Sequence, residues 1–428
     1  MRSPRATLII VLPLLALIAG ATVLWQKSHD PLCDGQRLSA WIGQLEDERP
    51  EIHEASANAC RKLGAQAVPA LAHALRIKDS RIRIALIRWT RNLPVLKFRS
   101  LDSARLRAQA AGVLSQLGGA AWEAAPELTA ALGDPSDFVA DRSQEALQAI
   151  GAPAMPTLIN ALAAQNPNIR RRASEILGSM PEAGDAVALA LADGLDDSEI
   201  SVRRAAARSI GRLIPMPEVS VPALGRRLAD SSGSVREECA LALSRFGPLA
   251  SAAASELVSA LTDNSDGVRI AAANALGRIG MDAPHAAISA LTKNLDHSSS
   301  LVRSSSALAL GRIGPQAFEA TARLALSLKD LDGATRAEAA SALGRIGPAA
   351  AESVPSLEQA LNDDIPATRA CAAQALGKIG EAARVSVPAL IRAWNNDHSG
   401  IGHAVLDALR RLTPDVAAQL SNTGGEAR

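Results

Sequence analysis

Acidic and basic side chains recur at a fixed spacing in this 428-residue chain. In five places an aspartate precedes an arginine by six residues. Paired charges occur in active sites, but a carboxylate can also accept backbone amides at a helix start together with an arginine fork. Because the pairs recur with a constant period, we interpret them as a structural ladder without a catalytic role. The pairs are Asp197/Arg203, Asp230/Arg236, Asp263/Arg269, Asp330/Arg336 and Asp363/Arg369.

Some positions lack one member of the pair. If the aspartate and the arginine of one repeat depend on each other, the ladder should be interrupted wherever either is missing. Three such places follow from the spacing: Arg170 with Ala164, Arg303 with His297, and Asp134 with Ala140.

The densest cluster of cations lies in residues 76–107, where ten Lys and Arg face only two Asp. The pattern predicts an extra amphipathic helix over residues 81–92, ended by Pro94. Such a basic segment could bind an anionic glycan, a phospholipid headgroup or an acidic protein. The alternative is a solvated helix that packs on its neighbours. The candidate binding residues are Arg81, Arg83, Arg88, Trp89, Arg91, Lys97 and Arg99.

A second set of cations is periodic and forms what we call the cation row. Each member can offset the negative end of a helix, or the row can serve as a track for an acidic partner. The overall balance of 45 basic and 44 acidic residues favours the first interpretation. The row consists of Arg212, Arg245, Arg278, Arg312, Arg345 and Lys378.

Other kinds of chemistry find little support. Histidine is directly followed by glutamate only at His53, and the chain has no Cys-x-x-Cys pair, glycine-rich phosphate loop or Gly-x-Ser-x-Gly nucleophile motif. We therefore expect no metal, no cofactor and no enzymatic activity. Cys33 and Cys60 fall in the first repeat and form a candidate disulfide in an oxidising compartment.

These residues must be positioned by a repeated element. The motif ALGRIG recurs almost unchanged, and its final glycines lie 34, 33 and 33 residues apart. A constant period of this length predicts a helical hairpin stacked many times. With weaker copies included, eleven repeats close at Gly64, Gly118, Gly151, Pro181, Ile214, Gly247, Gly280, Gly314, Gly347, Gly380 and Thr413.

Residues 354–380 illustrate one repeat. Pro355 suits the first turn of a helix A, because its missing amide is unpaired there in any case. Residues 362–366 break that helix, and an alanine-rich helix B follows over residues 367–378. Gly380 is expected to end helix B as a left-handed cap.

The sequence of these repeats resembles the HEAT-repeat family, most closely its phycobilisome-lyase-like subtype, over roughly residues 35–414. The resemblance implies an all-α, right-handed superhelical α-solenoid of about eleven hairpins, with the charged pairs linking successive repeats. It also implies a protein-binding platform. Bilin lyase or isomerase activity is the alternative that the subtype suggests. The deoxyhypusine hydroxylases resemble this architecture too, but bind iron through several His-Glu pairs, which are lacking here.

The N-terminus predicts export. Arg2 and Arg5 precede an uncharged run over residues 6–25, long enough to span a bilayer. The run could be retained as an anchor, or cleaved after Ala21 as a signal peptide. Either outcome places the repeat body outside the cytoplasmic membrane.

These observations predict three regions: an anchor or signal peptide over residues 1–30, a solenoid over residues 31–414 with the basic insertion at about 76–107, and a flexible tail over residues 415–428. A near-zero net charge and 2% aromatic residues do not favour nucleic acid. We expect a non-catalytic protein-interaction scaffold of the cell envelope. Recognition of an anionic glycan or lipid by the insertion is a further alternative.

Overall fold

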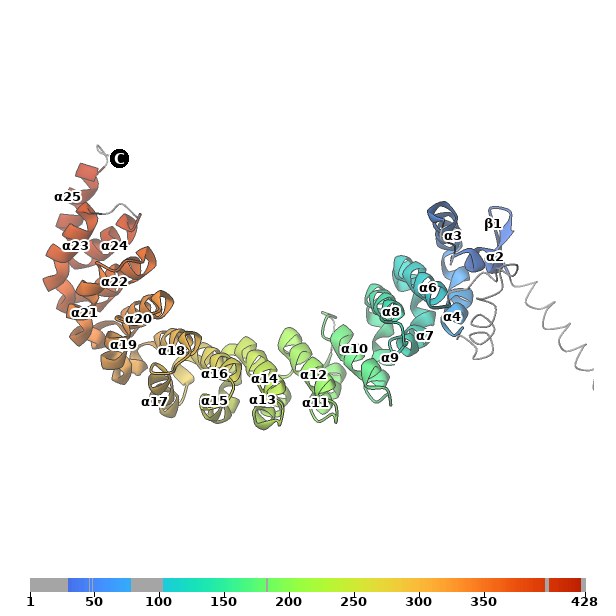
Figure 1. The fold of residues 1–428 in the computed structure, drawn as a ribbon, viewed down its shortest axis with the longest axis horizontal. Coiled ribbons are helices and arrows are strands. Elements are labelled where there is room, and N and C mark those ends of the chain that lie inside the picture. Colours follow the sequence, from blue (N-terminus) through green and yellow to red (C-terminus); the bar gives the residue numbers. More distant parts are fainter. Residues whose placement is uncertain are drawn as a thin grey trace, which may run out of the picture. The chain divides into compact units, whose positions relative to one another are not determined.

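The computed structural model describes residues 30–45, 47, 49–77, 103–181, 184–396 and 400–424. They fall into two compact units, Met1–Glu182 and Ala183–Arg428. Helices dominate both units (Figure 1). The predicted membrane segment over residues 6–25 and the seven candidate binding residues of the insertion lie outside the described residues. Within the described ranges, no helix is both long and apolar enough to cross a membrane.

The first unit begins with a short antiparallel β-hairpin, in which Leu32 pairs with Arg37 and Cys33 with Gln36. Asp34 and Gly35 form its turn with positive φ angles of 48° and 80°, a conformation that Asp-Gly favours. This Asp-Gly pair was the available sequence signal for a hairpin that the all-α expectation did not include. The elements are β1 (Leu32–Cys33), β2 (Gln36–Arg37), α2 (Leu38–Gln44), α3 (Pro50–Leu63), α4 (Val68–Leu75), α6 (Ser103–Leu117), α7 (Ala125–Ala131), α8 (Asp137–Ile150), α9 (Met155–Ala161) and α10 (Pro167–Leu177).

The second unit continues the alternation of a shorter helix A and a longer helix B. Its helices are α11 (Asp185–Gly194), α12 (Ile200–Leu213), α13 (Pro217–Arg226), α14 (Gly233–Phe246), α15 (Ala254–Ala260), α16 (Asp266–Ile279), α17 (His285–Asn294), α18 (Ser300–Ile313), α19 (Thr321–Ser327), α20 (Gly333–Ile346), α21 (Val354–Ala360), α22 (Pro366–Ile379), α23 (Val387–Asn395), α24 (Gly402–Leu412) and α25 (Pro414–Gly424).

The described helices pair into eleven hairpins, from α2/α3 to α23/α24, as the repeat period predicts. In the hairpin of α21 and α22, Pro355 lies in the first turn of α21, and Ala372, Leu376 and Ile379 are buried on α22. Gly380 has φ +81° but ψ −134°, which lies outside the left-handed helical region. The expectation of a left-handed cap was therefore wrong in ψ, although the positive φ still requires glycine.

The closing glycines do not lead directly into the next helix A. A short 3-10 segment usually intervenes, such as Gly347–Ser353 before α21 and Gly380–Ser386 before α23. The extended ψ at the glycine turns the chain into this segment.

A seam of glycine and alanine joins successive B helices of the second unit. A Cβ atom added at Gly344 of α20 would lie 2.8 Å from the Cα and 3.0 Å from the Cβ of Ala375 on α22. Only a glycine permits this approach, because real Cβ atoms keep a larger distance. The same contact recurs as Gly211 on Ala242, Gly277 on Ala309, Gly311 on Ala342, and Gly377 on Ala408.

The seam explains the shape of the second unit. Its B helices, α12 to α24, pack on each other far more extensively than its A helices do. Figure 1 shows the B helices on the inner side of the curve of this unit and the A helices on the outer side. Close approach in one layer and wider spacing in the other bends the stack toward the closer layer.

The chain after the last hairpin is not a flexible tail throughout. Residues 414–424 form helix α25, which packs on α24 and buries Ala417. The prediction of a tail over residues 415–428 was wrong for this part. A solenoid end exposes apolar surface that a further repeat would cover, and α25 covers part of it.

Candidate functional site

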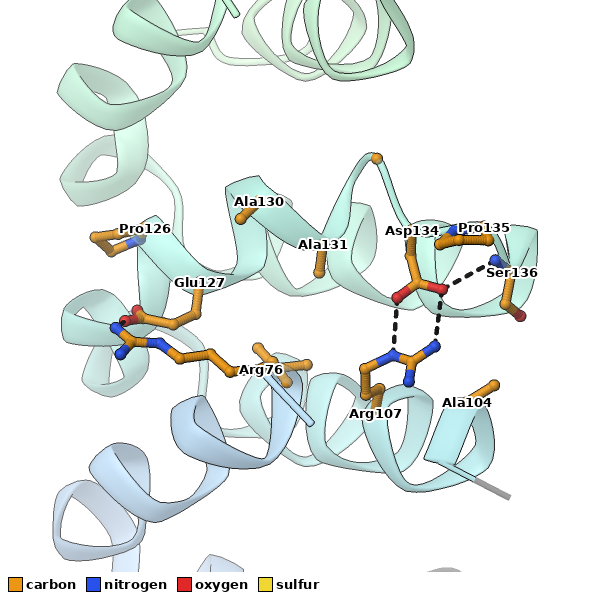
Figure 2. Close-up of a pocket in the computed structure, with 12 residues that line it drawn as sticks. Arg76, Ala104, Arg107, Pro126, Glu127, Ala130, Ala131, Asp134, Pro135 and Ser136 are labelled. Atoms are coloured by element: carbon orange, nitrogen blue, oxygen red, sulfur yellow. Dashed lines mark hydrogen bonds and ion pairs between the residues drawn. The ribbon is translucent and has the colours of Figure 1, made fainter. Parts of the chain in front are cut away.

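One rung of the charged ladder is visible in the first unit (Figure 2). Arg107 on α6 donates through Nε and Nη2 to the two carboxylate oxygens of Asp134, at 2.8 and 3.0 Å. Its Nη1 donates to the carbonyl oxygen of Ile77 at 2.8 Å. Asp134 Oδ1 also accepts the backbone N–H of Ser136, the residue before α8. The rung thus joins α6 to the start of the next B helix.

The second unit repeats this arrangement. Arg203 on α12 forms the same two bonds to Asp230, at 2.8 and 3.0 Å, while its Nη1 donates to the carbonyl oxygen of Asp197 at 2.8 Å. Asp230 then accepts the N–H of Ser232, which precedes α14. The remaining rungs, with their Nε–Oδ2 distances, are Arg236–Asp263 (2.7 Å), Arg303–Asp330 (2.7 Å) and Arg336–Asp363 (2.6 Å).

The ladder links successive repeats, as the family resemblance implies, but its register differs from the same-repeat pairs named from the sequence. Each arginine of these rungs pairs through its side chain with the aspartate of the following repeat, 27 residues later. In the second unit, the same arginine hydrogen-bonds the residue six positions before it only at the main-chain carbonyl oxygen of that residue. Arg236, for example, binds the carboxylate of Asp263 and the carbonyl oxygen of Asp230. The sequence spacing of 27 contained this alternative, since it equals the period of 33 less six.

Arg369 on α22 shows the difference most directly. We expected its side chain to pair with the Asp363 carboxylate, and this prediction was wrong. Its Nη1 instead donates to the carbonyl oxygens of Asp363 and Asp364, at 2.5 and 3.1 Å, while Arg336 of the preceding repeat binds the Asp363 carboxylate. The residue 27 positions after Arg369 is Asn396.

Arg269 on α16 is a predicted ladder arginine that forms no rung with an aspartate of the following repeat in the described structure. We expected it to pair with the Asp263 carboxylate, but its Nε donates to the carbonyl oxygen of Asp263, at 2.6 Å. Its Nη1 donates to Asn294 Oδ1 at 3.2 Å. In the following repeat, His297 stands where other repeats have the aspartate. The amide oxygen of Asn294 is therefore the side-chain atom of that repeat that accepts a hydrogen bond from Arg269.

The predicted interruptions therefore fall in other places. Arg303 still pairs with Asp330, although His297 replaces its own acid. His297 Nδ1 accepts the N–H of Ser299, so the histidine replaces aspartate at the helix start.

The other two predicted interruptions lie in the first unit. Asp134, expected to lack a partner because Ala140 follows it, pairs with Arg107 of the preceding repeat. Arg170 binds the carbonyl oxygen of Ala164, at 2.8 Å, which is the main-chain contact that the other repeats make to their aspartate.

The ladder aspartates have shifted pKa values. Burial by itself raises the pKa of Asp230, but the hydrogen bonds from Arg203 and from the Ser232 amide, with the nearby positive charges, outweigh it and lower the pKa. For Asp263 the hydrogen bond from Arg236 is the largest cause, and the pKa is again lowered. The pKa values of Asp330 and Asp363 shift in the same direction.

These shifts predict acid sensitivity. Because the carboxylates bind protons less readily when folded, the unfolded chain holds more protons as pH falls below about 5. We expect the free energy of unfolding of the second unit to be level above that pH. It should then decrease as pH falls through the ordinary pKa of 3.8 toward the lower folded values. Urea titrations of the full chain at stepped pH check this.

The variant Asp263→Asn should be less stable at neutral pH and lose less on acidification, since one shifted carboxylate is gone. Asp282→Asn, at an exposed position outside the ladder, is the control and should keep the parental pH profile. If Asp263→Asn keeps the full acid-induced loss, the ladder is not its source.

The cation row lies on the B helices of the second unit, and all six predicted members are exposed. Arg411 on α24 occupies the next equivalent position and extends the row. The sequence contained this signal, since Arg411 lies two residues before Thr413 as Arg212 lies two before Ile214. The aliphatic stems pack along the glycine seam: a Cβ at Gly277 would lie 3.4 Å from Arg312 Cδ, and one at Gly377 would lie 3.5 Å from Arg411 Cδ. The seam thus sets the spacing of the row.

A cavity in the first unit borders the rung of Figure 2. It has a volume of about 1040 Å³ and is lined by Leu75, Arg76, Ala104, Arg107 and Glu127 among others. Arg76 pairs with Glu127 across it, and Arg107 is held by Asp134. Its charges are thus mutually satisfied. Within the described residues, no group of three or more His, Cys, Asp and Glu side chains could hold a metal ion.

Cys33 lies on β1 and Cys60 on α3, which pack together. Both are free thiols in this structure. Burial, followed by the nearby Cys33, raises the pKa of Cys60 to about 11. The disulfide between them stays a prediction for an oxidising compartment. Cys239 is fully buried, consistent with a packing role.

Comparison with known proteins identifies the family. The family model for HEAT repeats matches residues 155–244, 188–265, 221–311, 254–327 and 320–410 of the chain. Together these matches cover more than half of the chain. The chain therefore belongs to the HEAT-repeat family, as the wording of its repeats predicts. No curated protein matches it.

Similar solved structures share the fold. An engineered protein is 19% identical with a TM-score of 0.50, over 87% of this chain and 98% of its own. Importin beta is 15% identical with a TM-score of 0.53, over 90% of this chain and 63% of its own length. Kap95p, in a structure that describes its binding to RanGDP, is 14% identical with a TM-score of 0.53, over 88% and 55%. The chain thus spans less than two thirds of the length of these two proteins.

Proposed function

We propose that this protein is a non-catalytic scaffold that binds an extended protein partner along the exposed face of its B helices. The observation that carries the proposal is the glycine–alanine seam of the second unit, which holds equivalent side chains of successive repeats in one regular layer. Such a layer can make many similar contacts along one partner. Kap95p, which has the same fold, binds RanGDP and is a precedent for partner binding by such a solenoid.

Site-specific photo-crosslinking tests the proposal. A photoreactive residue placed at Ser341 on α20 or Gln374 on α22 lies on the B-helix face, whereas one at Ser259 on α15 or Gln359 on α21 lies on the A-helix layer. In cells expressing the full chain, we expect discrete protein adducts from the first two positions and few from the last two. Equal adducts from both layers, or none, would contradict the proposed face.

We also propose that the repeat body lies outside the cytoplasmic membrane, held by residues 6–25 or released by cleavage after Ala21. The support is the uncharged run behind Arg2 and Arg5. Cell fractionation with N-terminal sequencing of the mature protein distinguishes the two forms, and a cytoplasmic protein with an intact N-terminus would contradict both. A bilin chromophore in the purified protein would favour the lyase alternative instead. Loss of partner capture after charge reversal at Arg81, Arg83, Arg88 and Arg91 would favour the basic insertion as the site.

A further inference from the structure

We propose that the partner of the second unit is an acidic, extended polypeptide whose carboxylates pair with the cation row. This inference rests on the proposed function and specifies the class of partner. The row then consists of Arg212, Arg245, Arg278, Arg312, Arg345, Lys378 and Arg411.

The cations of the row differ from the ladder arginines in having few partners of their own. Arg278 donates to the carbonyl oxygen of Ser244 at 3.3 Å, and Arg411 pairs with Asp407 one turn away. The side chains of the other members make no hydrogen bond or ion pair with any described residue. These members are Arg212, Arg245, Arg312, Arg345 and Lys378.

Neighbouring cations of the row also repel one another. The pKa of Arg312 is lowered, first by partial burial and then by the positive charges of Arg278 and Arg345. The negative end of each B helix attracts a cation anywhere in its last turn. It does not require all seven cations to occupy one equivalent position. A chain of anions laid along the row would relieve the repulsion at each repeat.

The acids on the same face do not cancel the row. Glu238 accepts a hydrogen bond from Arg208 at 2.7 Å, and Asp407 is engaged with Arg411. Glu338 lies close enough to raise the pKa of Arg312 but forms no ion pair within the described structure. The face therefore keeps an excess of positive charge, although the chain as a whole is nearly neutral.

The neighbouring side chains favour a polypeptide over a nucleic acid. One helical turn before the row, five of the seven B helices carry uncharged side chains, and the other two carry Arg208 and Asp407. None of these side chains has an aromatic ring, so bases would lack a stacking surface. Packed helices lie about 8–10 Å apart, which matches one turn of a polyproline II-like extended chain, with three residues per turn at about 3.1 Å per residue, so that every third side chain points to the same side. The five uncharged residues one helical turn before the row are Leu241, Asn274, Leu308, Ser341 and Gln374.

Binding of a fluorescent peptide to the full chain tests the inference. The peptide has about 24 residues with glutamate at every third position, the spacing expected for a polyproline II-like extended chain along the row. The row variant combines Arg278→Gln, Arg312→Gln and Arg345→Gln. The matched control, Arg226→Gln with Lys293→Gln and Lys329→Gln, removes three exposed charges from the A-helix layer or the turn that follows it. Circular dichroism of both variants is the check that they are folded.

We expect fluorescence anisotropy to show binding that weakens with added salt, about tenfold weaker binding by the row variant, and a change within about twofold for the control. Absence of binding at low salt, or equal losses in both variants, would overturn the inference. Tighter, row-dependent binding of single-stranded oligothymidylate or of phosphatidylserine vesicles would also overturn it, in favour of those ligands.

The crosslinking experiment separates the two proposals. If a partner is captured from Gln374 whether or not the row is neutralised, the scaffold function stands and the acidic partner is wrong. If neither the peptide binds nor any adduct forms, both are wrong.

Discussion

Replacing Asp230 by alanine should lower the free energy of unfolding of the second unit by about 3 kcal/mol, because it leaves a buried charge without its partner. The side chains of Arg203 and Asp230 are only 9% and 3% exposed, and two hydrogen bonds join them. The substitution also removes the acceptor for the Ser232 amide before α14. Urea unfolding of the full chain, followed by circular dichroism, measures the loss.

The exposed ion pair between Arg384 and Glu381 is a matched control. Its side chains are 57% and 78% exposed, so Glu381→Ala should cost no more than about 0.5 kcal/mol. The double variant Arg203→Met with Asp230→Leu should recover much of the stability, since apolar side chains replace both buried charges. Equal effects of Asp230→Ala and Glu381→Ala would show that the rung contributes no more than a surface pair.

The second large effect concerns the seam. Gly344→Ala should destabilise the second unit by about 2 kcal/mol, because the new methyl group would lie 2.8 Å from the Cα of Ala375 and two packed helices would have to separate. This outcome is opposite to the gain that glycine-to-alanine usually brings inside a helix. Thermal and urea unfolding measure the change.

Gly112→Ala on α6 provides the comparison. A Cβ at Gly112 meets nothing within 4 Å, so the variant should be unchanged or more stable by up to about 1 kcal/mol. A stabilised Gly344→Ala protein would mean that the B helices separate at little cost, and the seam could not then fix the spacing of the row.

The two effects have a functional consequence. The ladder joins successive repeats at the starts of their B helices, and the seam fixes the approach of those helices nearer their other ends. Loosening either should disturb the spacing of the cation row. We therefore expect destabilised variants that remain folded to bind an extended acidic peptide less tightly.

The sequence by itself determined the repeat, its eleven hairpins and the two helices of the repeat over residues 354–380. Local features suffice for these, because Pro355 can begin a helix, Gly380 can adopt positive φ, and apolar residues at helical spacing define a buried face. The Asp34-Gly35 turn is also a local feature, so the sequence could have predicted the β-hairpin that it forms.

Only the tertiary structure decided which repeat each charge serves. Arg203 lies six residues after Asp197 and 27 before Asp230, and both spacings are periodic, so the sequence cannot tell which side chains meet. Three-dimensional stacking brings the next repeat's carboxylate to the guanidinium and leaves only a carbonyl oxygen of its own repeat. Likewise Gly344 and Gly347 look alike in the sequence. One is required by contact with Ala375 and the other by its own φ, because contacts across a stack depend on the neighbour's position and backbone angles do not.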